Sequence, residues 1–134
     1  MIVNERVVSY INSLDRGNSD ICNIIEKEAI EDQVPIIRKE MGNLLKVLLK
    51  LKQPKSILEV GTAVGYSSIL MSENMPVDCK IVTIENYDKR IPIARNNIKR
   101  AGKEDCIQLI EGDAMEVLKE LEGPFDFIFM DAAK

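Results

Sequence analysis

Apolar residues in the first third of the chain recur every three or four positions, which is the spacing of one face of an α-helix. The pattern is interrupted by a polar stretch around position 17 and again near position 33. Helices are therefore predicted at about residues 3–14, 20–32 and 35–53, with Ser19 or Asp20 as a cap of the second and Pro35 in the first turn of the third. The third helix has a wide apolar face and ends before Pro54.

From residue 55 onward, short runs of apolar and β-branched residues alternate with helical segments. Strands are predicted at residues 56–60, 80–85, 106–111 and 125–131, separated by helices at about 66–75, 88–100 and 114–121. Helices of this length between strands indicate right-handed crossovers and a parallel sheet, and the apolar strands fit burial on both faces. The pattern predicts one α/β domain, residues 1–134, with helices in 1–53 and the sheet in 54–134.

The carboxyl ends of the predicted strands carry either a glycine-rich turn or an acidic residue. In a parallel sheet these ends lie at one edge, where ligands bind. Gly61 and Gly65 allow a sharp turn that can approach a ligand closely, because neither has a Cβ atom. Glu85, at the end of the second strand, can accept hydrogen bonds from both hydroxyls of a ribose. The sequence therefore predicts a cofactor that contains a nucleoside.

The residues in the first turn favour one class of nucleoside cofactor over others. Ala63 stands where a dinucleotide site has its second glycine. The loop therefore lacks the glycine that lets a pyrophosphate come close to the backbone. The negative charge of Glu59 beside the turn repels a diphosphate and suits the ammonium and sulfonium groups of S-adenosylmethionine. The alternative is a Rossmann-like module without enzyme activity that binds NAD or a regulatory nucleotide.

Composition excludes several classes of function. The chain has no histidine, which excludes a histidine-based catalytic triad and histidine-ligated zinc, and its net charge of −4 does not indicate nonspecific nucleic-acid binding. Its apolar runs are too short to span a bilayer, and its N-terminus lacks the apolar stretch of a signal peptide. Three widely spaced cysteines are typical of reduced thiols, so a cytoplasmic protein without membrane contact is predicted.

Four segments together resemble the catechol and caffeoyl-coenzyme-A O-methyltransferase superfamily. They are residues 59–67 (EVGTAVGYS), 112–114 (GDA), 131–134 (DAAK) and 34–37 (VPII). The resemblance covers the whole chain and implies a Rossmann-like methyltransferase fold with sheet order 3-2-1-4. The sequence, including residues 34–37, looks most similar to bacterial enzymes that methylate 5-hydroxyuridine at the wobble position of transfer RNA, which makes tRNA the expected partner.

The resemblance also implies a role for each matching residue. For the cofactor, it implies that Ile37 packs nearby, that Ser67 and the Gly61 turn hold the methionine part, and that Glu85 binds the ribose. Asp113 and Ala114 would frame the adenine. Asp131 would ligate magnesium near the cofactor amine, and Lys134 would act as the base. The hydroxyl of the acceptor would then attack the methyl carbon in line with the sulfonium, with a divalent cation and Lys134 assisting its deprotonation.

The same resemblance leads to expectations about the chain's extent and partners. Relatives continue beyond this point with further strands and an Asp-Asn pair that completes the metal site, so we expect a truncated chain that is itself inactive. A small catechol-like phenol or a coenzyme-A ester remains the alternative acceptor. A predicted helix carries four basic residues that could contact RNA phosphates: Arg95, Lys99, Arg100 and Lys103. Residues 125–131 would form an apolar edge strand, and we expect homo-oligomers.

Overall fold

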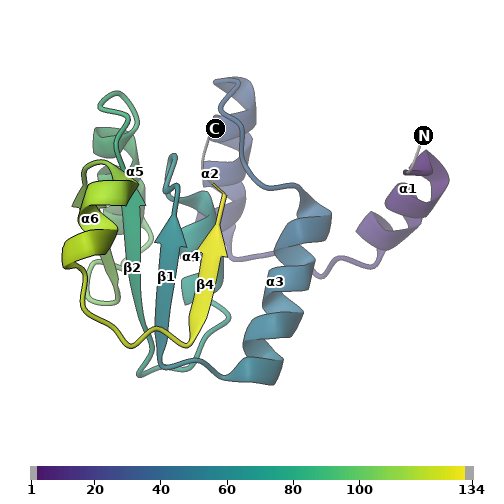
Figure 1. The fold of residues 1–134 in the computed structure, drawn as a ribbon. Helices are drawn as coiled ribbons and strands as arrows, with labels where there is room; N and C mark the ends of the chain where they lie inside the picture. Colours follow the sequence, from purple (N-terminus) through teal and green to yellow (C-terminus); the bar gives the residue numbers. More distant parts are fainter. Residues whose placement is uncertain (1–2, 132–134) are drawn as a thin grey trace.

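The computed structural model describes residues 3–131, and it shows an α/β fold with a single sheet (Figure 1). Its elements, in chain order, are α1 (Glu5–Ser13), α2 (Asp20–Glu31), α3 (Lys39–Lys52), β1 (Ser56–Val60), α4 (Tyr66–Ser72), β2 (Lys80–Glu85), α5 (Ile91–Arg100), β3 (Ile107–Glu111), α6 (Ala114–Glu120) and β4 (Phe127–Met130). The predicted alternation of strands and helices after residue 55 is therefore confirmed.

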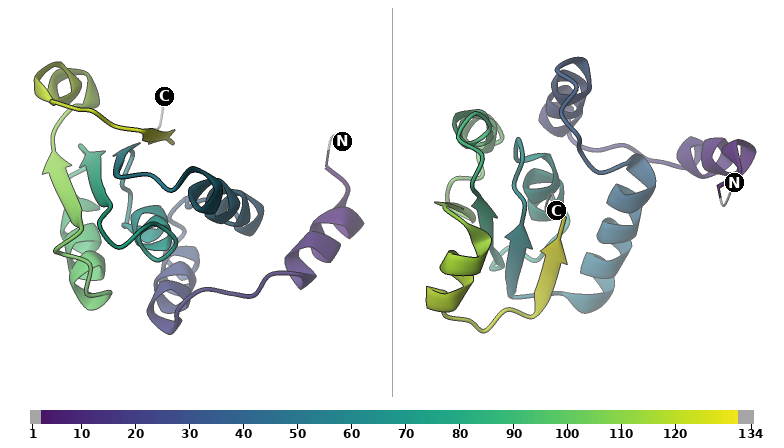
Figure 2. Two further views of the ribbon diagram at one scale, coloured as in Figure 1. Left: turned by 90° about the horizontal axis from the view of Figure 1, so that it is seen from below. Right: turned by 45° about the horizontal axis from the view of Figure 1, so that its top comes forward.

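The four strands form one parallel sheet in the order β3-β2-β1-β4, as expected. Val60 at the end of β1 pairs with Ile84 on one side and with Met130 on the other. Helix α6 covers one face of the sheet, and α4 and α5 cover the opposite face (Figures 1 and 2). Because every strand runs the same way, all four carboxyl ends lie at the same edge of the sheet.

Two helices begin later than the sequence pattern predicts, and proline explains one of them. The expected start of α5 near Asp88 is wrong, since the helix begins at Ile91 with Pro92 in its first turn. An earlier start would place Pro92 in the helix interior, where its missing N–H breaks the hydrogen-bond ladder. The expected helix start at Pro35 is also wrong, because Val34, Ile36 and Ile37 pack as non-helical chain against the main core. Burial of these side chains outweighs the preference of proline for a first helical turn.

The largest hydrophobic core lies between the sheet and α2, α3, α4 and α5. All seven residues of α4 are buried, and Ile69 at its centre has no exposed surface. Burial raises the pKa of the Cys22 thiol to about 12 and that of Cys79 to about 11, so both stay protonated as packing residues. All three cysteines are free, as expected.

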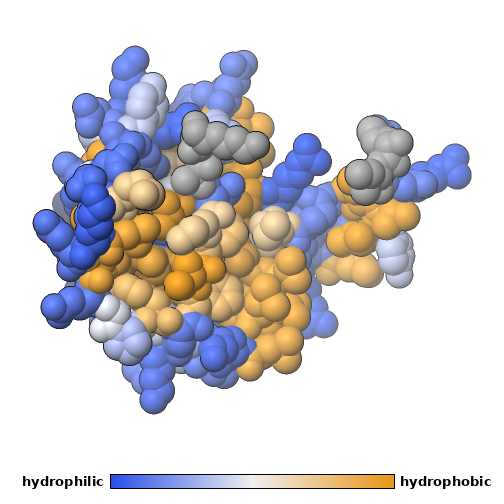
Figure 3. All heavy atoms as spheres, in the orientation of Figure 1, coloured by the Kyte–Doolittle hydropathy of each residue, from blue (hydrophilic) through white to orange (hydrophobic). Residues whose placement is uncertain are grey.

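Strand β4 lacks the burial on both faces that the inner strands have, as expected for an apolar edge strand. Phe127 and Phe129 are half-buried against the main core, whereas Ile128 and Met130 are 55% and 62% exposed. Apolar side chains gather on the face of the molecule that carries β4 and α3 (Figure 3). Within residues 3–131, β4 is an edge strand, and this explains the loss of cover on one of its faces.

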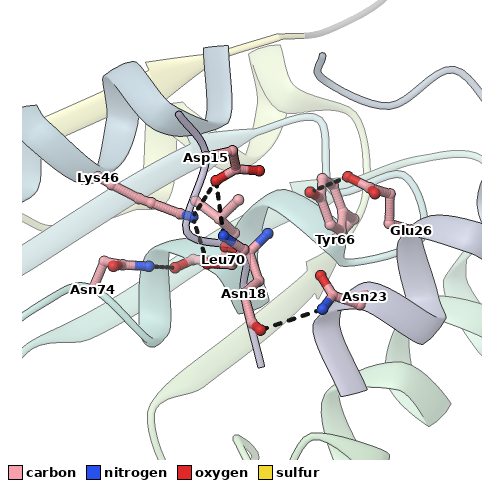
Figure 4. A network of polar contacts seen from close by, with 9 residues as sticks. Asp15, Asn18, Asn23, Glu26, Lys46, Tyr66, Leu70 and Asn74 are labelled. Carbon is pink, nitrogen blue, oxygen red and sulfur yellow. Dashed lines mark hydrogen bonds and ion pairs between the residues drawn. The ribbon is translucent and has the colours of Figure 1, made fainter. Parts of the chain in front are cut away.

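Helix α1 projects from the rest of the molecule, and none of its residues is buried (Figures 1 and 2). Polar contacts hold the segment that connects it to α2 (Figure 4). The Lys46 ammonium lies 3.9 Å from Asp15 and donates to the Gly17 carbonyl at 3.2 Å, while Asn23 donates to the Asn18 carbonyl at 3.3 Å. No helix within residues 3–131 is long and apolar enough to cross a membrane.

Candidate functional site

The loop between β1 and α4 turns through several residues in the left-handed backbone region. Gly61 has φ +101° and Gly65 has φ +86°, backbone conformations that residues other than glycine rarely adopt. The Gly61 amide donates to the Ile84 carbonyl at 2.9 Å, which ties the loop to the end of β2. The predicted sharp turn at the end of the first strand is therefore present. We call residues 61–65 the cofactor loop, because the sequence predicts that they approach a cofactor.

Glu85 lies directly against this loop. One of its carboxylate oxygens accepts a hydrogen bond from the Ala63 amide at 2.7 Å, and the other accepts from the amides of Asn86 and Tyr87 at 3.1 Å. Ala63 has φ +49°, a left-handed conformation that costs an alanine about 1–2 kcal/mol. The hydrogen bond to Glu85 helps to hold that conformation. In the sequence, Ala63 stands out only as a replacement for a glycine, and its contact with Glu85 is not predicted.

Glu59 is buried beneath the loop, with 0% of its surface exposed. Its carboxylate accepts hydrogen bonds from three hydroxyls, those of Ser67 at 2.5 Å, Thr83 at 2.6 Å, and Ser68. Burial raises the pKa of Glu59, and the three hydroxyls oppose that rise only in part. Glu59 lies beside the turn, as expected, and its carboxylate is enclosed there by hydroxyl groups.

The ends of the other strands lie next to the loop. The Asp131 amide donates to the Val60 carbonyl at 3.0 Å, and this places the exposed Asp131 beside Gly61. The Gly112 amide donates to the Glu85 carbonyl at 3.0 Å, so Asp113 follows directly beside the end of β2. Together these contacts bring most of the predicted site residues to one edge of the sheet.

The remaining predicted residues are placed less directly. Asp113 is exposed and caps α6, because one of its oxygens accepts from the Met115 amide at 2.9 Å. Ala114 is half-buried against the core on the α6 side, and Ile37 is half-buried against the main core. Lys134, the predicted base, lies outside the described residues.

Several residues around the loop were missed from the sequence. Thr62 is buried and shares a hydrogen bond of 2.6 Å with Thr83, while the buried Asn97 of α5 donates to the Val64 carbonyl at 2.8 Å. The only sequence signal is a polar residue inside an apolar element, such as Thr83 within β2. The contacts depend on which strands are neighbours, which periodicity does not reveal.

Cavities do not mark this site as clearly as the strand ends do. Cavities of about 420 and 700 Å³ lie around the α1–α2 connection and are lined in part by Asp15 and Asn18. A cavity of about 310 Å³ lies between α2 and α5 and touches Val64 of the loop and Tyr87 after β2. The carboxyl ends of the strands are thus the better guide, because they carry the charged and polar groups.

The residues described do not by themselves form a metal centre. Within residues 3–131, no three acidic or cysteine side chains are grouped so that they could hold a metal ion. Asp131 is an exposed carboxylate, but the nearby Glu59 is enclosed by hydroxyls. One carboxylate does not satisfy a magnesium ion, which prefers six oxygen ligands in octahedral geometry.

Comparison with known proteins identifies the family. The sequence profile of a family described as "O-methyltransferase" matches residues 18–134. The chain belongs to this O-methyltransferase family. The match includes the cofactor loop, Glu85 and the ends of β3 and β4, and so confirms the family resemblance that the four sequence segments indicated.

Named relatives of this O-methyltransferase chain include two types. A catechol O-methyltransferase of Niastella koreensis is 36% identical over 136 residues, which cover 97% of this chain and 62% of that protein. Caffeoyl-CoA O-methyltransferase 1 of Eucalyptus globulus is 38% identical over 102 residues, covering 69% of this chain and 40% of that protein. The chain therefore spans less than two thirds of the length of these relatives.

Solved structures agree with the fold. The SAH-bound methyltransferase PaMTH1 of Podospora anserina has a TM-score of 0.89 and 32% identity, over 96% of this chain and 56% of its own. The SAM complex of TomG from Streptomyces achromogenes has a TM-score of 0.84 and 31% identity, over 98% of this chain and 63% of its own. The Rossmann-like methyltransferase fold is confirmed, and the alternative of an NAD-binding module loses its support.

Proposed function

We propose that the whole protein is an S-adenosylmethionine-dependent O-methyltransferase whose acceptor is the hydroxyl of a catechol-like aromatic ring. The observation that carries this proposal is the contact between Glu85 and the cofactor loop, in a chain whose residues 18–134 match the O-methyltransferase family. Relatives named as catechol and caffeoyl-CoA O-methyltransferases support an aromatic hydroxyl as acceptor.

The residues at the sheet edge suit the two ends of this cofactor. Glu85 would accept hydrogen bonds from the ribose hydroxyls, and the adenine would lie toward Asp113 and Ala114. The amino-acid part would lie along the turn at Gly61 and Ser67, with its ammonium near the exposed carboxylate of Asp131. In this arrangement Asp131 complements the positive ammonium, while Glu85 and Asp113 offer hydrogen-bond acceptors to the nucleoside.

The proposed reaction is a single displacement. An oxygen lone pair of the acceptor attacks the methyl carbon while the bond from that carbon to the sulfonium sulfur breaks, giving the methyl ether and S-adenosylhomocysteine (SAH). The proton of the hydroxyl passes to a base, for which we propose Lys134. Holding the oxygen and the methyl group in line contributes much of the rate, because it removes the entropic cost of bringing them together.

We propose that the whole protein requires magnesium. We also propose that it is located in the cytoplasm. Asp131 is the one predicted ligand in the described residues, which do not form a complete site. A chelator provides a direct test of the requirement.

Transfer RNA is the second candidate acceptor, and ion pairs weaken the case for it. Of the four basic residues expected to contact RNA, Arg95 pairs with Glu111 at 2.9 Å and Arg100 pairs with Glu28 at 2.8 Å. These acidic partners offset two of the four positive charges, and so reduce the attraction of this face for phosphates. A small aromatic acceptor does not need such a basic face.

An assay of methyl transfer tests the proposed function. The whole protein is incubated with S-adenosylmethionine labelled in the methyl group and, separately, with a catechol, a phenolic coenzyme-A ester and undermodified tRNA. We expect label in the catechol or the ester, none in tRNA, and loss of transfer in excess chelator. Label in tRNA alone would replace the aromatic acceptor with the wobble uridine, and full activity in chelator would exclude the metal.

We further propose that copies of this chain associate through the apolar face of β4 and α3. Within residues 3–131, Ile128 and Met130 on β4 and Leu51 on α3 are exposed, and β4 is an edge strand whose outer backbone groups can pair with another strand. Light scattering of the 134-residue chain should show a dimer or larger species. Ile128→Lys should shift it toward the monomer, and a wild-type monomer at high concentration would contradict the proposal.

A further inference from the structure

The hydroxyl groups around Glu59 connect three separate segments beneath the cofactor loop. Ser68 belongs to the first turn of α4, Thr83 to β2 and Glu59 to β1. We propose that Thr83 and Ser68 are positioning residues, which act through Glu59 to hold the cofactor loop in the shape that receives the amino-acid half of S-adenosylmethionine. This inference rests on the proposed function and adds two residues to it.

Burial means that the oxygens of Glu59 need hydrogen-bond donors from the protein itself. The side chains of Glu59, Ser68 and Thr83 have no exposed surface. A buried carboxyl group destabilises the fold unless its oxygens find donors, and hydrogen bonds to a charged oxygen are stronger than those between neutral groups. Each hydroxyl that donates to Glu59 therefore holds the segment that carries it. Loss of one hydroxyl leaves a buried carboxylate oxygen with one donor fewer.

The direction of the hydrogen bonds extends this cluster into the loop itself. Thr83 has a single hydroxyl proton, and it donates that proton to Glu59 at 2.6 Å. When Glu59 is ionised, the Thr62 hydroxyl, 2.6 Å from the Thr83 oxygen, is the donor in the bond between the two threonines. Thr62 belongs to the cofactor loop, so the series of hydrogen bonds from Thr62 through Thr83 to Glu59 connects the loop to β2 and β1.

The strand register explains why these side chains meet. Glu59 is paired with Thr83 across the parallel strands β1 and β2, so both side chains project from the same face of the sheet. Glu85 lies two residues further along β2 and binds the Ala63 amide. Side chains of β2 thus hold the loop at two neighbouring points, Thr83 at Thr62 and Glu85 at Ala63.

These two points are assigned to different halves of the cofactor. Glu85 is proposed to bind the ribose, whereas the Glu59 cluster includes Ser67 and lies beneath the turn proposed for the amino-acid part. A defect in the cluster should therefore weaken contacts to the amino-acid part and spare those to the nucleoside. A residue that only stabilised the fold would affect both halves alike.

The test measures two ligands on the whole protein. The ligands are SAH and 5′-methylthioadenosine, which keeps the nucleoside and lacks the amino-acid group. Thr83→Val removes the hydroxyl and keeps the shape, and Thr83→Ser restores a hydroxyl as the matched control. We expect Thr83→Val to bind SAH about tenfold more weakly, with methylthioadenosine affinity unchanged and with Thr83→Ser close to wild type.

Several outcomes would overturn the positioning role of Thr83 and Ser68. Unchanged SAH affinity in Thr83→Val, or an equal loss for both ligands, would overturn the positioning role. If Thr83→Val does not fold, Ser68→Ala is measured with the same two ligands, and the same criteria decide. If wild-type protein binds methylthioadenosine but not SAH, the positioning role is wrong, whereas failure to bind either ligand would overturn the proposed function itself.

Discussion

Replacing Glu85 with alanine should weaken binding of S-adenosylmethionine to the whole protein by about 1–3 kcal/mol, or roughly fivefold to more than a hundredfold. The substitution removes the carboxylate that is proposed to accept the ribose hydroxyls. It also removes the acceptor of the Ala63 amide, which lies 2.7 Å from the Glu85 carboxylate in the loop. Both losses act on the same ligand, so the effect on affinity should be large.

Glu111 supplies a matched control for this measurement. It is paired with Glu85 across β2 and β3, at the end of the neighbouring strand, but its side chain contacts Arg95 instead of the loop. Calorimetric titration should show wild-type affinity for Glu111→Ala and a clear loss for Glu85→Ala. Unchanged affinity in Glu85→Ala would remove Glu85 from the cofactor site.

Replacing Ile69 with alanine should lower the free energy of unfolding by about 2–5 kcal/mol. Ile69 lies at the centre of α4, whose residues are all buried between the sheet and the helices on that face. The substitution removes buried methyl groups and leaves a cavity that the surrounding side chains can fill only in part. Because α4 directly follows the cofactor loop, the same change should also loosen the site.

Ile30 on α2 is the control, since it allows the same change on a helix surface. Its side chain is 62% exposed, and Ile30→Ala should alter the free energy of unfolding by no more than about 0.5 kcal/mol. Urea denaturation of both variants at one low protein concentration measures the difference. Equal effects at the two positions would mean that α4 is not packed as described.

Much of the fold could be predicted from local sequence patterns. Ser19 caps α2 as expected, because a serine side chain accepts the amide of Cys22 at the start of the helix. Gly61 and Gly65 take left-handed conformations that other residues avoid, and the strand ends gather at one edge because the strands are parallel. These features depend on near neighbours in the chain or on a general rule of parallel sheets.

The features that could not be predicted depend on which segments become neighbours in space. The enclosure of Glu59 by hydroxyls requires the pairing of β1 with β2, and the left-handed Ala63 is held by Glu85, which lies 22 residues away in the sequence. The expectation of tRNA as acceptor rested partly on residues 34–37. Val34, Ile36 and Ile37 in this segment pack against the main core, so they contribute to the stability of the fold.

Titration of the protein with SAH and, separately, with NAD⁺ tests most directly whether the cofactor loop and Glu85 form the S-adenosyl site of an O-methyltransferase. We expect saturable binding of SAH with one site per chain, and no detectable binding of NAD⁺. Binding of NAD⁺ without binding of SAH would contradict the assignment and favour a dinucleotide module.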